Sequence, residues 1–233
     1  PAARLAAQPG DFPVVGGNRV ELLADYDGAV DRLVADVDAA RSTVHLLYYI
    51  LEPDGTGWKV GEAVLRAARR GVSCRLLVDG MASRPAIDEM APRLREAGAE
   101  IIAVLPPGIR GARRDLRNHR KIAVVDGRVG YTGSQNVVDA FNYKNRGLTY
   151  EELVLRVEGP VVAELQAVLL TDRLLETGRV AGEGEPARAL AAAFPELPPA
   201  GTALAQVLPS GPAYETANNQ RVFVQLFYEA RRR

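Results

Sequence analysis

HRKIAVVDGRVGYTGSQN, residues 119–136, is the stretch that decides the fold of this chain. Its β-branched run 122–125 is followed by Asp126-Gly127 and then by a second extended run, 129–132. Two such runs joined by a turn dipeptide are typical of a β-hairpin. The sequence therefore predicts a hairpin over this stretch.

His119 and Lys121 open the hairpin, two residues apart. Because side chains alternate along a strand, we expect the imidazole and the ammonium to share one face, where a phosphate could lie between them. Gly133, Ser134 and Asn136 follow the second strand. They bring small residues and a side-chain amide to a place where a backbone can approach an oxyanion closely. The stretch thus indicates a phosphate site.

Composition bounds the class of protein. The chain has 233 residues, 47% of them hydrophobic, which is enough for a sizeable core. Lys and Arg together number 29, as do Asp and Glu, so the whole chain has no electrostatic preference for nucleic acid or for anionic membrane. The single cysteine, Cys74, excludes an intrachain disulfide, fits a reducing compartment and is expected to be buried in a strand.

Runs with strand character alternate with runs that have helical spacing of apolar residues. This order predicts an α/β sandwich with a largely parallel sheet, to which the hairpin adds antiparallel strands. The predicted helices are 25–40, 58–70, 87–97, 161–176 and 218–233, and the predicted strands outside the hairpin are 44–51, 72–79, 101–105, 152–158 and 203–208. No run is long enough to be a transmembrane segment, so we expect a cytoplasmic chain or one peripheral at the cytoplasmic membrane.

A basic cluster lies just before the hairpin and within its start. It consists of Arg110, Arg113, Arg114, Arg117 and Arg120. Such a cluster is either a solvated loop or a local positive field for an anionic headgroup or backbone. Beside a phosphate-type motif we favour the second interpretation.

The spacing His-x-Lys, four residues, Asp, six residues, Gly-Ser-x-Asn resembles the HKD motif of the phospholipase D superfamily. Further stretches, among them Tyr48-Tyr49-Ile50 and Glu158-Gly159-Pro160, are similar to the amino-terminal half of bacterial cardiolipin synthases. The resemblance implies a phospholipase D-like α-β-α sandwich that is one half of a pseudo-twofold enzyme. It further implies a first HKD domain at 1–177, a linker or surface excursion at 178–202, and the start of a second half, a strand and a helix, at 203–233.

The resemblance also implies roles for single residues. His119 attacks phosphorus and forms a phosphohistidine, while Lys121 and Asn136 stabilise the charge on the phosphoryl oxygens. Asp126 counts among the catalytic motif residues, although as a turn residue it more plausibly holds the shape of the motif. No metal or cofactor is expected.

An attacking imidazole needs a carboxylate on its other nitrogen. Glu152 best matches the acid that serves this purpose in the family, with Glu151 as the runner-up. Ser134 could bond a phosphate oxygen or simply permit tight packing. His45, flanked by Val44 and Leu46, is interpreted as structural.

Only His45 and His119 exist, and no second copy of the motif is found, so the chain holds at most one catalytic half-site. The leading hypothesis is a phosphatidyltransferase of the cardiolipin synthase type that passes a phosphatidyl group from a phospholipid to an alcohol acceptor. Water as acceptor would make it a phospholipase D hydrolase. A homodimeric single-motif endonuclease and an inactive lipid-binding half remain open, although zero net charge argues against nucleic acid. The second HKD half would come from the same polypeptide or from a homodimer partner.

Overall fold

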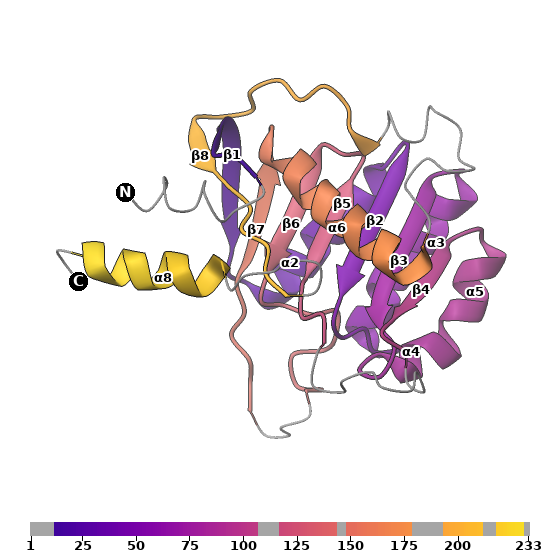
Figure 1. Ribbon diagram of the computed structural model, residues 1–233. Helices are drawn as coiled ribbons and strands as arrows, with labels where there is room; N and C mark the ends of the chain where they lie inside the picture. Colours follow the sequence, from indigo (N-terminus) through magenta and orange to yellow (C-terminus); the bar gives the residue numbers. More distant parts are fainter. Residues whose placement is uncertain (1–11, 107–116, 144–147, 179–192, 212–217, 231–233) are drawn as a thin grey trace.

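The predicted hairpin forms, and its strands lie in the middle of an eight-stranded sheet (Figure 1). The computed structural model describes residues 12–106, 117–143, 148–178, 193–211 and 218–230. The strand order is β4-β3-β2-β5-β6-β7-β1-β8. The strands are β1 (Val15–Leu23), β2 (Thr43–Tyr48), β3 (Ser73–Asp79), β4 (Glu100–Val104), β5 (Ile122–Val125), β6 (Val129–Gly133), β7 (Val154–Glu158) and β8 (Ala203–Ala205).

Helices cover both faces of this sheet, as the α/β class requires (Figure 1). One core lies between the sheet and α2, α3 and α5, and the other lies between the sheet and α6. The helices are α2 (Tyr26–Ala39), α3 (Gly55–Arg69), α4 (Arg84–Glu89), α5 (Ala91–Glu96), α6 (Val161–Thr177) and α8 (Asn218–Glu229). The predicted helix 87–97 is thus two short helices, because Pro92 cannot donate the backbone bond that would join them.

The expectation of a largely parallel sheet is wrong. Only β2 with β3 and β3 with β4 pair in parallel, whereas the other five pairings among the described residues are antiparallel. Alternation of helices and strands holds only up to β4, and the hairpin, β7 and β1 then add neighbours that need no helical crossover. The sheet is therefore mixed.

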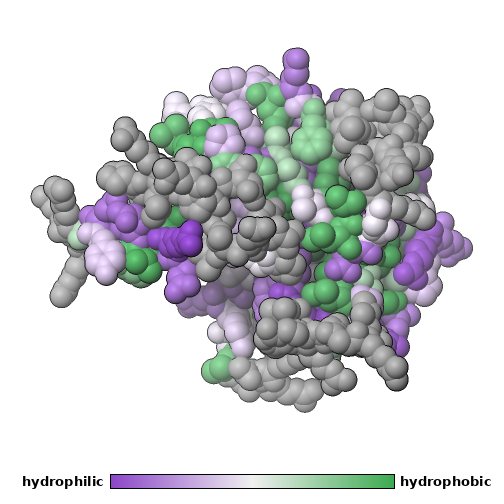
Figure 2. Space-filling view, viewed as in Figure 1, coloured by the Kyte–Doolittle hydropathy of each residue, from purple (hydrophilic) through white to green (hydrophobic). Residues whose placement is uncertain are grey.

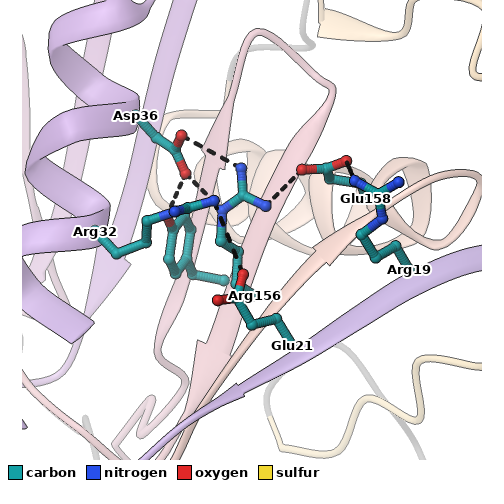
Figure 3. A network of polar contacts seen from close by, with 7 residues as sticks. Arg19, Glu21, Arg32, Asp36, Arg156 and Glu158 are labelled. Carbon is teal, nitrogen blue, oxygen red and sulfur yellow. Dashed lines mark hydrogen bonds and ion pairs between the residues drawn. The ribbon is translucent and has the colours of Figure 1, made fainter. Parts of the chain in front are cut away.

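β1 was not among the predicted strands, and it pairs with β7 on one side and β8 on the other. Its sequence, VGGNRVELL, has two glycines after Val15 and carries charges at alternate positions, so it lacks the apolar signal of a half-buried strand. These charges form ion pairs: Arg19 pairs with Glu158, which also binds Arg156, and Glu21 pairs with Arg32 of α2 (Figure 3).

β8 belongs to the same sheet as β1, so 203–205 forms part of this fold. The division into residues 1–177, 178–202 and 203–233 stays a prediction, and much of the predicted linker, 179–192, lies outside the described residues. α8 projects away from the sheet (Figure 1). None of the helices that the structure describes has the length and apolarity needed to cross a membrane.

Asp126 occupies the hairpin turn with a positive φ of 52°. Its carboxylate accepts hydrogen bonds from the backbone N–H groups of Arg41, Ser42 and Thr43 and from the Ser42 hydroxyl, at 2.7 to 3.2 Å. These contacts fix the entry into β2, at the end of β5 opposite to His119. Burial alone would raise the pKa of Asp126, but the hydrogen bonds from Thr43, Arg41 and Ser42 outweigh it and lower the pKa.

We predict that Asp126→Ala lowers the free energy of unfolding by about 2–4 kcal/mol, because several charge-assisted hydrogen bonds are lost together. Asp126→Asn should lose less, since asparagine keeps an acceptor oxygen and tolerates a positive φ. Because the pKa is lowered in the folded state, this stabilisation is present at neutral pH and is lost as the pH falls through that pKa, below about 4. Urea unfolding at pH 7 and at pH 3 measures both effects. Equal losses for Asp126→Ala at the two pH values would contradict the assignment.

Candidate active site

His119 and Lys121 lie immediately before β5 rather than within it, so the expectation that they share a strand face is wrong. The pairing of β2 with β5 reaches only Leu47 and Ile122, and residues 117–121 therefore have no strand partner. The Lys121 ammonium still reaches His119, since it donates to the His119 backbone carbonyl oxygen at 2.6 Å.

Tyr49, the residue after β2, forms the floor under both groups. The His119 ring stacks on the Tyr49 ring with centroids 3.7 Å apart and planes 19° from parallel. The Lys121 nitrogen lies 5.6 Å from the centroid of the same ring, within cation–π range. Tyr49 thus orients the imidazole and the ammonium together. Sequence reasoning did not assign it a role, although it ends a buried strand at the sheet edge where the hairpin begins.

Glu152, Tyr143 and Asn136 continue the site. Glu152 lies close enough to Lys121 to raise its pKa, and it accepts a hydrogen bond from the Tyr143 hydroxyl at 3.1 Å. The Asn136 backbone N–H contacts the same hydroxyl, and Asn136 Oδ1 accepts from the Ile50 N–H at 3.0 Å, next to Tyr49. These contacts link Lys121, through Glu152, Tyr143 and Asn136, to Ile50 beside Tyr49. No direct bond from Glu152 to His119 is present in the described part of the chain.

Ser134 lies next to these contacts, because it bonds the neighbour of Glu152. Its hydroxyl accepts from the Leu153 N–H at 3.1 Å, and its own N–H donates to the Leu153 carbonyl at 3.0 Å. Ser134 therefore prolongs the contact between β6 and β7 and holds Leu153, the neighbour of Glu152. Glu151 is exposed beside it.

The electrostatics favour a neutral imidazole. Partial burial of the His119 ring and then the nearby Lys121 ammonium lower the pKa of His119, while Asp79 acts in the opposite direction. Burial also lowers the pKa of Lys121, against the influence of Glu152. A neutral ring has a nitrogen lone pair, so His119 can act as a nucleophile at neutral pH.

A pocket of about 180 Å³ opens beside these groups. Its lining combines His119, Arg120 and Lys121 with polar groups of Thr132, Ser210 and Asn219 and with apolar side chains: Ile122, Leu165, Val168, Val207 and Leu208. The volume is roughly that of six water molecules, enough for a phosphodiester and the carbons next to it. In the part of the chain that the structure describes, no three His, Cys, Asp or Glu side chains are grouped so that they could hold a metal ion.

The basic cluster is less available than its sequence suggests. Arg117 pairs with the buried Asp79 at 3.4 Å and donates to the Leu105 carbonyl at 2.6 Å. Arg120 pairs with the buried Asp172. Both guanidinium groups thus compensate internal carboxylates. Arg110, Arg113 and Arg114 lie outside the described residues.

His45 is fully buried in β2, on the side of the sheet that α6 covers. Arg75 Nη1 lies 2.9 Å from Nε2, and the Gln166 carboxamide lies 2.7 Å from Nδ1. Burial and then Arg75 lower the pKa of His45 to about 3. His45 is therefore a neutral core residue, and it does not line the pocket described above.

A family model described as "Cardiolipin synthase, PLD-like domain" matches residues 33–171. Cardiolipin synthase A of Pectobacterium carotovorum subsp. carotovorum is 37% identical over 171 residues, which are 71% of this chain and 35% of that protein. Cardiolipin synthase A of Yersinia pseudotuberculosis serotype O:1b is 38% identical over the same shares of both chains. The match thus spans about a third of the length of these curated relatives.

Among solved structures, the fold resembles that of a phospholipase D family member, Nuc from Salmonella typhimurium. The TM-score is 0.52 at 18% identity, over 68% of this chain and 95% of that one. This likeness supports the α/β fold with a mixed sheet. On the family match and the identity to its curated relatives, the chain belongs to the cardiolipin synthase, PLD-like domain family of the phospholipase D superfamily.

Proposed function

We propose that this chain carries one of two half-sites of a phosphatidyltransferase of the cardiolipin synthase type. The observation that carries the proposal is the lining of the pocket, in which His119 and Lys121 occur together with apolar side chains of β5, α6 and the segment after β8. A phospholipid presents the same combination, a charged phosphodiester attached to a glycerol and to acyl chains. The relatives named cardiolipin synthase A support the same substrate class.

The proposed first step is attack of the neutral His119 ring on phosphorus. A nitrogen–phosphorus bond forms while the bond from phosphorus to the leaving alcohol oxygen breaks. A protonated histidine of a second half-site gives its proton to that oxygen. The alcohol acceptor then loses its proton to the same histidine and attacks the phosphohistidine, which releases His119. Water in the acceptor's place would give hydrolysis.

The neighbours of His119 stabilise charge in this scheme. Lys121 faces the nonbridging oxygens, and Asn136 contributes amide donors from its Nδ2, since its Oδ1 is already bonded to Ile50. Glu152 sets the electrostatic environment of Lys121 from a position fixed by Tyr143. Asp126 acts at a distance, by fixing the turn of the hairpin.

The exposed apolar surface fits a chain that works with a second half. Figure 2 shows apolar side chains on the face of the sheet that carries α6 and on α8. On α8, Phe223, Leu226 and Phe227 follow helical spacing and are exposed, Phe227 by 76%. Large exposed patches of this kind mark interaction sites. The second half would come from the same polypeptide or from a homodimer.

We predict that His119→Ala reduces phosphatidyl transfer by roughly three orders of magnitude or more while the fold is kept, because the nucleophile is lost from an exposed position. Phospholipid labelled in its phosphate measures two quantities: its turnover reports transfer, and acid-labile label on the protein reports the phosphohistidine. Circular dichroism reports the fold. Asp126→Ala should show the opposite pattern: its fold is less stable, but the folded protein still acquires the acid-labile label. Near-normal turnover in His119→Ala would exclude His119 from the site.

We predict binding to vesicles of anionic phospholipid in preference to DNA, because Arg117 and Arg120 are internally paired and the pocket has an apolar wall. Vesicle flotation and a DNA mobility shift at the same moderate salt compare the two. Tight, salt-sensitive DNA binding without vesicle binding would favour the endonuclease. Vesicle binding by a chain that performs no transfer in any assembly would favour the inactive lipid-binding half.

We predict that the 233-residue chain is not an active monomer, because the scheme needs a second histidine and His45 is buried in the core. Light scattering coupled to activity measurement on each separated species tests this. A monodisperse monomer with full phospholipid turnover would refute the two-half scheme.

A further inference from the structure

The residues on both sides of His119 are held by one carboxylate, that of Asp172 on α6. Asp172 is only 3% exposed. Its Oδ2 accepts a hydrogen bond from Asn118 Nδ2 at 2.9 Å, and both its oxygens accept from Arg120 Nη1, at 2.5 and 2.7 Å. The Arg120 backbone N–H donates to Asn118 Oδ1 at 3.1 Å. Asn118, Arg120 and Asp172 thus form a closed triangle of polar contacts.

This triangle fixes a segment that the sheet does not fix. Residues 117–121 lie outside any strand, and His119 is itself exposed. The side chains on either side of it reach α6, while the imidazole stacks on Tyr49. Without the anchor, the backbone and the ring would have many accessible conformations, of which few support in-line attack.

The same triangle also contacts a second segment that lines the pocket. Arg120 Nη2 donates to the Ser210 carbonyl oxygen at 2.7 Å, and Ser210 lines the pocket together with Val207 and Leu208. The Asp172 carboxylate therefore restrains the segment that contains His119 and, through Arg120, the segment that contains Ser210.

We propose that Asp172 is a positioning residue, which holds His119 in its reactive geometry on Tyr49 through Asn118 and Arg120. The inference rests on the proposed function for its catalytic meaning. Its geometric content concerns only where the His119 ring lies, and this can be measured without turnover.

The chain offers a direct readout, because His45 and His119 are its only histidines. The pKa of His45 is about 3, so between pH 5 and 8 the titrating imidazole signal belongs to His119, and a His119→Gln variant assigns it. Stacking on Tyr49 should displace the His119 ring protons upfield by the ring current. NMR of the intact chain with labelled histidine therefore reports the stacked position.

Asp172→Asn keeps the shape of the side chain and removes the charge that holds Arg120. Asn118→Ala removes one anchor and leaves the ion pair of Asp172 with Arg120 in place. The matched control is Asp36→Asn on the other face of the sheet, where Asp36 bonds Arg156 at 2.8 Å and also accepts from Tyr131 (Figure 3). It loses a comparable carboxylate–arginine pair far from His119.

We expect both Asp172→Asn and Asn118→Ala to lose most of the upfield displacement of the His119 signals, and Asp36→Asn to retain it. In whichever assembly transfers phosphatidyl groups, kcat should fall on the order of 100-fold in Asp172→Asn with KM little changed, because binding groups remain and alignment is lost. If Asp172→Asn does not fold, Asn118→Ala decides the question.

Retention of the upfield displacement in a folded Asp172→Asn or Asn118→Ala variant would overturn the inference, as would its equal loss in Asp36→Asn. Absence of transfer by the wild-type chain in every assembly would instead count against the proposed function, and the NMR comparison would still decide the role of Asp172.

Discussion

The antiparallel pairing of β2 with β5 is the constraint on which the site depends. Its register sets Leu47 opposite Ile122 and Val44 opposite Val125. Continued outward in one direction, the same register would place Tyr49 opposite Arg120, the neighbour of His119. Because residues 117–121 lie outside the strand, the His119 ring can stack on the Tyr49 ring there. In the other direction it brings Thr43 to Asp126, whose N–H donates to the Thr43 carbonyl at 2.8 Å. The pair of β2 and β5 therefore has the candidate active site at one end and the turn that Asp126 stabilises at the other. A shift of one residue would turn every side chain to the opposite face and separate the two rings.

The hairpin and most helices could be predicted from local pattern, because their signals lie within a few residues. The β1 strand could not, since its charges find their partners only in β7, where Arg19 pairs with Glu158, and in α2, where Glu21 pairs with Arg32. The parallel sheet was wrong for a related reason: strand order depends on partners far along the chain. His119, Lys121 and Asn136 followed from motif spacing and are brought together, whereas Tyr49, Tyr143 and Asp172 are joined to them only by the fold. Glu152 lies near Lys121 rather than bonded to His119, a distinction of side-chain direction that no sequence pattern contains.

Buried charge in this protein is arranged as networks on both faces of the sheet. On the α2 side, Arg156 contacts Asp36 and Glu158 (Figure 3). On the α6 side, Arg75 and Arg173 share Glu100, and Arg75 also contacts His45. Buried ion pairs contribute little net stability, because desolvation offsets attraction, but removing one partner is strongly destabilising. Such networks therefore restrict how strands and helices can pack. The Asp172 triangle is a further network of this kind, and it lies beside His119.

Cys74 shows how well the core beside β3 is shielded from solvent. Cys74 is the second residue of β3, its thiol lies 3.9 Å from the Val64 carbonyl oxygen on α3, and burial raises its pKa to about 12. Hardly any thiolate exists at neutral pH, and the thiolate is the form that alkylating reagents attack. Modification of this sulfur in the native protein requires α3 to separate from the sheet. The rate of that modification therefore measures how often this part of the domain opens locally.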